Sequence, residues 1–149
     1  MAQLRSLLPY ISLLSVIYLA SGFLALYNWL VESLIGGQGI LTSFAPADVG
    51  FAIVMLAVGI TFIGSLYYMR LGDDVRSSAC LIVGSGLAVA ALIVHVLVVI
   101  AALADAIIMS ETLTIYDLAL KLVRAEFSLG LIVIPLLLIA LKHIKRLVS

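Results

Sequence analysis

His95 is the residue whose type and position best suit chemistry. It lies within residues 79–104, a run without any charged side chain. A histidine inside a membrane helix can ligate haem iron or a metal, relay a proton, or hydrogen-bond to a neighbouring helix. A haem held between two histidines needs a second one, and the chain's other histidine, His143, comes after the last apolar run. No cofactor is therefore predicted for this chain alone, and haem stays open only with a ligand from a partner chain.

A group of charged residues is the second candidate site. Arg124 precedes the uncharged run 127–141, and acidic residues expected on the same side of the membrane offer it counter-charges. One interpretation is an ion-paired clasp between helix ends, because ionisable residues at membrane edges commonly pair. The other is an entrance for an anion or substrate, centred on Lys121 and Arg124. The candidate cluster comprises Glu32, Asp48, Asp105, Asp117, Lys121, Arg124 and Glu126.

Catalytic motifs are missing from the sequence. It carries no HExxH motif, no paired metal-ligand spacing and no glycine-rich nucleotide fingerprint. Ser85 and His95 would lie about 15 Å apart along one helix, too far to act as nucleophile and base. The single cysteine, Cys80, excludes an intrachain disulfide. We therefore predict no catalytic residue and no metal site, and the sequence does not favour an enzyme.

The elements that must position these residues are membrane spans. The chain has 149 residues, of which 65% are hydrophobic and 11% charged, against about 25% charged in soluble domains. The formal net charge of zero gives no electrostatic basis for binding nucleic acid. We expect an all-α bundle of four transmembrane helices in a single domain, 1–149. The expected spans are about 7–33, 47–70, 78–105 and 115–146, the last crossing the membrane at about 124–142.

Small residues recur on two of these spans and predict packing faces, because small side chains let helices approach closely in lipid. The predicted faces contain Gly84, Ala88, Ala91 and Ala102, beside His95, and Gly50, Ala57 and Gly64. Pro135 lies inside the fourth span, where it removes a backbone hydrogen bond. The fourth helix is therefore predicted to be kinked, and to extend beyond the membrane before its apolar part.

The distribution of charge predicts the orientation. The N-terminus, the connection at 70–78 and the C-terminus carry six basic residues against two acidic ones, whereas the other two connections carry two against six. Because basic residues concentrate on the cytoplasmic side, we expect a multi-pass protein of the cell membrane with both termini in the cytoplasm.

Three functional classes follow. The favoured one is a non-catalytic accessory or structural subunit of a larger membrane complex of respiratory or transport type. The first alternative is a small homo-oligomeric transporter or channel, with His95 and the Lys121/Arg124 stripe as its pathway. The second is a redox subunit in which His95 contacts haem or quinone. The expected partners are lipid and either other membrane subunits or further copies of this chain.

Overall fold

The protein is a bundle of long helices. A computed structural model describes residues 6–109 and 124–148, and it contains no strand within those ranges. Its helices are α2 (Leu8–Leu30), continued by the π-helical turn η1 (Val31–Ile35), α3 (Val49–Arg70), α4 (Asp74–Ile108) and α6 (Ala125–Val148). Four helices are long and apolar enough to cross a membrane, which confirms the predicted all-helical membrane class.

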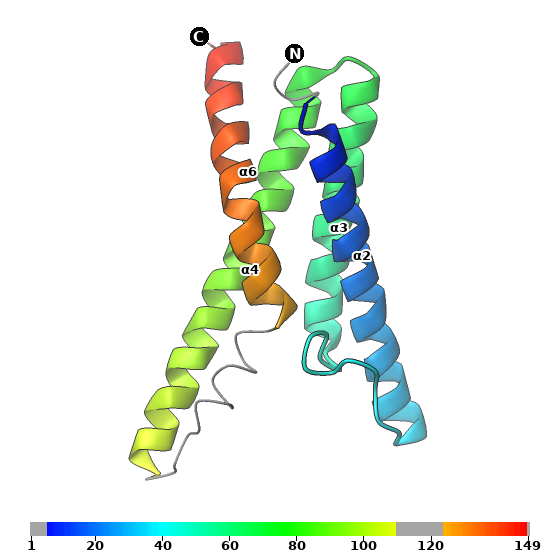
Figure 1. Ribbon diagram of the computed structural model, residues 1–149, viewed down its shortest axis with the longest axis vertical. Coiled ribbons are helices and arrows are strands. Elements are labelled where there is room, and N and C mark those ends of the chain that lie inside the picture. Colours follow the sequence, from blue (N-terminus) through cyan, green and yellow to red (C-terminus); the bar gives the residue numbers. More distant parts are fainter. Residues whose placement is uncertain (1–5, 110–123, 149) are drawn as a thin grey trace.

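The helices form two antiparallel pairs, α2 with α3 and α4 with α6 (Figure 1). The start of α2, the turn between α3 and α4 and the end of α6 lie at one end of the bundle. Toward the opposite end α4 diverges from α2 and α3, so the pairs form a V (Figure 1). The cytoplasmic assignment of the first end stays a prediction.

Two glycines bring α2 and α3 into close contact. A Cβ on Gly22 would lie 2.8 Å from Cγ of Leu56, and a Cβ on Gly59 would lie 2.7 Å from Cγ of Leu19. Each leucine is three residues from the glycine on its own helix, so the two contacts are reciprocal. Close approach of this kind maximises van der Waals packing, which drives helix association in lipid.

The turn between α3 and α4 is closed by local hydrogen bonds. Gly72 has a φ of 76°, a left-handed conformation that glycine adopts without steric cost. The carboxylate of Asp73 caps α4 by accepting from the backbone N–H of Arg76 at 3.0 Å. One turn further in, the hydroxyls of Ser65 and Ser77 are 3.0 Å apart and buried. These contacts fix α4 against α3 at this end.

Helix α6 packs on α4 and also reaches α2. A Cβ on Gly130 would lie 2.7 Å from Cβ of Leu92, so the helices are closest there. The hydroxyl of Tyr10 on α2 donates to the carbonyl of Ile132 at 2.7 Å. This bond comes three residues before Pro135, which lies inside α6 and supplies no N–H. The kink at Pro135 and the extension of the fourth helix before residue 124 stay predictions, the latter because 110–123 lie outside the described residues.

The predicted packing residues have different surroundings. Gly84 makes a close contact with Thr61 and Phe62. Ala88 is buried and its carbonyl faces Gly130. The other members of the predicted faces are less tightly surrounded. Ala91 and Gly50 line a pocket, and Ala57 and Ala102 are half-buried. A Cβ on Gly64 would lie 3.5 Å from Sγ of Cys80, an ordinary van der Waals contact.

Two glycines on α4 allow a direct test of the packing. A Cβ on Gly84 would lie 2.5 Å from Oγ1 of Thr61 and 2.9 Å from Cε1 of the buried Phe62, whereas a Cβ on Gly86 would meet nothing within 4 Å. Gly84→Ala should lower the free energy of unfolding by about 1–3 kcal/mol, the usual cost of overpacking. Denaturation in mixed micelles measures this change.

Gly86→Ala is the matched control. It should leave the stability unchanged or raise it by up to about 1 kcal/mol, because alanine has the better helix propensity. Equal effects of the two substitutions would contradict the close contact at Gly84.

Candidate functional site

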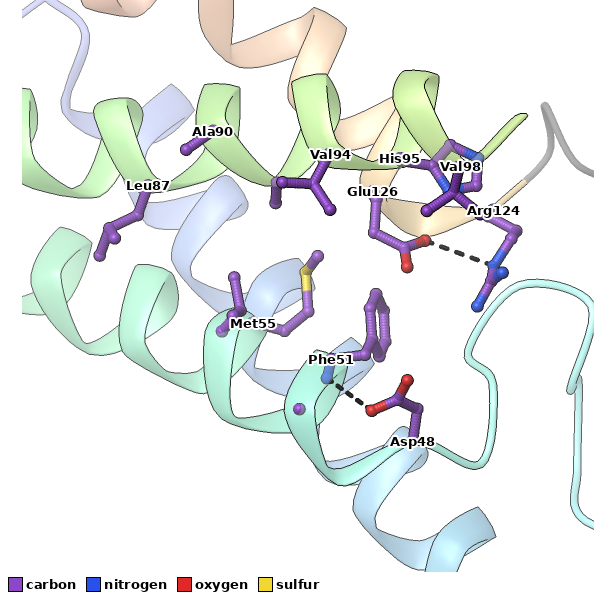
Figure 2. Close-up of a pocket in the computed structure, with 13 residues that line it drawn as sticks. Asp48, Phe51, Met55, Leu87, Ala90, Val94, His95, Val98, Arg124 and Glu126 are labelled. Carbon is purple, nitrogen blue, oxygen red and sulfur yellow. Dashed lines mark hydrogen bonds and ion pairs between the residues drawn. The ribbon is translucent and has the colours of Figure 1, made fainter. Parts of the chain in front are cut away.

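A cavity of about 510 Å³ lies between α3 and α4, on the side where the two helices diverge. The start of α6 closes one end of it (Figure 2). The cavity is polar at the end near α6 and apolar at the other. Its lining consists of Asp48, Gly50, Phe51, Val54, Met55, Leu87, Ala90, Ala91, Val94, His95, Val98, Arg124 and Glu126.

Asp48 stands at the mouth of the cavity because it is the N-cap of α3. Its backbone is extended, with φ −136° and ψ 118°, and its Oδ1 accepts from the N–H of Phe51 at 3.0 Å. A carboxylate in this position satisfies a helix N–H that has no partner within the helix. The second carboxylate oxygen stays available and points toward the cavity (Figure 2).

Arg124 immediately precedes α6, and Glu126 lies in its first turn. Nε of Arg124 lies 3.6 Å from Oε2 of Glu126, and the two side chains are 30% and 13% exposed. The backbone N–H of Ala125 donates to the carbonyl of Phe44 at 3.1 Å. This last bond fixes the start of α6, and therefore both charges, to the connection between α2 and α3.

That connection is held by Asn28, a completely buried residue of α2. Its Nδ2 donates to the carbonyls of Ile40 and Ala45 at 2.8 and 2.7 Å. Its Oδ1 accepts from the N–H of Ile40 at 2.8 Å. Gly39 packs directly on the amide, since a Cβ there would lie 2.7 Å from Oδ1. The side chain of Asn28 thus organises the loop that carries Phe44 and Asp48.

Asn28 was not among the site residues predicted from the sequence. One feature of the sequence could have indicated its role: the chain's only asparagine lies near the end of an apolar helix, shortly before a cluster of glycines. An amide has two donors and an acceptor, and the buried part of a loop needs such partners for its backbone.

His95 belongs to the polar end of the cavity. It is 5% exposed, and its ring meets the edge of Phe127 with centroids 6.4 Å apart. Along α4, the distance from its first residue, Asp74, to His95 is about 32 Å, and this distance is close to the length of α3. His95 is therefore level with the start of α3, and it lines the same cavity as Asp48. His143 is about 24 Å from Phe127 along α6, so the two histidines cannot share one haem iron.

The predicted charged cluster is brought together only in part. Asp48, Arg124 and Glu126 line the same cavity. Glu32 and Asp105 are exposed, and neither forms an ion pair with another residue of the described ranges. Asp117 and Lys121 lie outside the described residues, so the entrance centred on Lys121 stays a prediction. Within the described chain, no three potential ligands come together as a metal site would require.

The chemistry of this arrangement is that of a binding site. Its charged and imidazole groups can form hydrogen bonds and ion pairs, and its lining includes no hydroxyl or thiol nucleophile among the described residues. A concave, mostly apolar pocket with a few convergent polar groups is typical of small-molecule sites. Comparisons of the chain with models of protein families, with curated proteins and with solved structures find no match.

The role of Asn28 can be tested by removing its amide. Asn28→Ala leaves three backbone groups without this partner. The carbonyl of Ala45 is the buried one among them, and an unpaired buried group costs about 1–3 kcal/mol. We expect the free energy of unfolding to fall by about 1–3 kcal/mol, measured by denaturation in mixed micelles.

Gln38→Ala is the control, because it removes an exposed amide from the same loop. It should change stability by less than about 0.5 kcal/mol. If Asn28→Ala were equally harmless, the loop would not depend on this side chain.

Proposed function

We propose that this small integral membrane protein is an accessory subunit of a larger membrane complex, of respiratory or transport type, and that the outer half of α4 contacts its partner. The observation that carries the proposal is the exposure of α4. It is the most apolar of the four candidate spans, with a mean hydropathy of 2.9, yet only 17% of its most apolar window is buried, against 33–39% in the other three.

The length of α4 argues that lipid alone does not cover this surface. Residues 77–104 are uncharged, which corresponds to about 42 Å of helix. Placing all of it in about 30 Å of hydrocarbon requires a tilt of roughly 45°, beyond the usual range of 0–40°. A partner chain covering part of the run would remove this mismatch.

Five of the exposed side chains beyond His95 form a continuous stripe. Counted from the first, the others follow at three, four, seven and eleven residues, which places all five on one helix face. Two of them are alanines, which allow close approach of another helix. The stripe comprises Leu97, Ile100, Ala101, Ala104 and Ile108.

The experiment is native mass spectrometry of the tagged full chain, extracted from its own host in mild detergent. We expect recovery in a stoichiometric complex with different chains. Ala101→Trp should lower the recovery of those chains several-fold, because a large side chain prevents close helix contact. Ala20→Trp is the matched control, since Ala20 is exposed on α2, away from the stripe. Recovery of the unmodified chain alone would contradict the proposal.

The second candidate function is a small transporter or channel, favoured by the cavity between α3 and α4. Its charged and imidazole groups lie where α3 enters the apolar layer, as expected for the entrance of a pathway. Recovery of the chain as a homo-oligomer would favour this candidate over the subunit. Flux into vesicles by the reconstituted protein, lost in His95 and Arg124 variants, would then establish it.

We also propose that both termini are cytoplasmic. The bundle end that carries the α3–α4 turn holds Arg70, Arg76, Lys142 and Lys145, and basic residues favour the cytoplasmic side. In a background with Cys80 replaced by alanine, a membrane-impermeant maleimide applied to intact cells should label Ser43→Cys but not Ser6→Cys. The reverse labelling pattern would overturn this orientation.

A further inference from the structure

The cavity between α3 and α4 is polar at one end and apolar at the other. Asp48, Glu126 and Arg124 lie at the end where α3 and α6 begin, while Leu87 and Ala90 lie at the opposite end (Figure 2). Its volume of about 510 Å³ is within the range of sites for drug-sized ligands, about 300–1,000 Å³. Such a cavity suits an amphipathic molecule whose polar group lies at the membrane edge and whose apolar body extends toward the bilayer centre.

The charges at the polar end leave a negative excess. Arg124 is paired with Glu126, with 3.6 Å between Nε and Oε2. Asp48 accepts from a backbone N–H, and none of the described basic side chains pairs with it. Among the described residues, the cavity lining therefore carries two carboxylates and one guanidinium, together with the imidazole of His95. Near a low-dielectric region, this excess attracts a cation and repels an anion.

Phe51 favours an organic cation over a metal ion. Its ring stands at the polar end, between the carboxylates of Asp48 and Glu126 (Figure 2), and the residue is 7% exposed. An aromatic face attracts ammonium groups, most strongly where water is excluded. Apolar walls also suit a ligand with a hydrocarbon body, whereas they provide no ligand atoms for a hydrated metal ion.

We propose that this cavity binds an organic ammonium group carried on an apolar body. The ammonium lies between Asp48 and Glu126 against Phe51, and the body lies between α3 and α4, along Met55 and Val94. The ligand is either an amine-bearing lipid or a free lipophilic ammonium ion, which present the same chemistry to the site. The site is independent of the proposed α4 contact surface, whose residues lie outside the cavity lining.

The test uses the full chain in an uncharged maltoside detergent and three fluorescent probes with one diphenylhexatriene body. One carries trimethylammonium, one carries a carboxylate and one is neutral. Probe anisotropy measures binding. We expect the cationic probe to bind at least about tenfold more tightly than the other two, because only it gains the charge and cation–π interactions.

Two variants locate the interaction. Asp48→Asn removes the charge but keeps a good helix cap, and it should weaken binding of the cationic probe about fivefold or more while leaving the neutral probe unaffected. Phe51→Leu should weaken binding of the cationic probe about two- to fivefold. Asp105→Asn, an exposed acid outside the cavity lining, is the matched control and should change nothing. Equal binding of all three probes, or an unchanged affinity in Asp48→Asn, would overturn the proposal.

Competition identifies the source of the ligand. Displacement of the cationic probe by an ethanolamine-headgroup lipid assigns the site to a membrane amine. Displacement by a benzyltrialkylammonium salt, with no effect of that lipid, assigns it to a free lipophilic cation. Displacement by an anionic amphiphile as effective as either would contradict the ammonium site. Because the probe assay needs no partner chain, it stays informative even if the subunit proposal fails.

Discussion

The hydrogen bonds of Asn28 are the interaction on which the polar end of this bundle depends. A backbone group buried in an irregular segment must find a partner within the protein, because water does not reach it. One buried amide provides three such bonds to the loop between α2 and α3. The same loop presents the carbonyl of Phe44 to α6 and ends in Asp48, the cap of α3. A residue outside the cavity thus determines where its charged groups lie.

The rest of the bundle is held by close contacts at glycines. Between helices in lipid the hydrophobic effect contributes little, so packing and hydrogen bonds carry the association. Gly22 and Gly59 join α2 to α3, Gly84 joins α3 to α4, and Gly130 joins α4 to α6. The hydrogen bond from Tyr10 to Ile132 adds a tie between the first and last helices. Together these contacts connect all four spans.

The sequence was sufficient to predict the fold class but only part of the site. Long uncharged runs must be helical in a membrane, since only a helix satisfies its own backbone there. Spacing identified Gly84 as a packing residue, yet the equally plausible Gly50 lies beside its own helix cap and Gly130 was missed. Whether a glycine packs closely depends on the helix opposite it, and the spacing of residues within one helix carries no information about that neighbour. Likewise, Arg124 pairs with Glu126, two residues along the chain, because α6 starts between them and brings both side chains to one place.

The divergence of α4 from α3 couples the cavity to the thickness of the bilayer. A helix with too long an apolar run adapts to its membrane mainly by tilting, and the tilt grows as the hydrocarbon layer thins. Helix α4 is fixed to α3 at the turn near Gly72 and Asp73, so a change of tilt acts at its far end. The cavity lies on that side of the V. We therefore expect its width, and with it the volume offered to a ligand, to vary with the thickness of the surrounding bilayer.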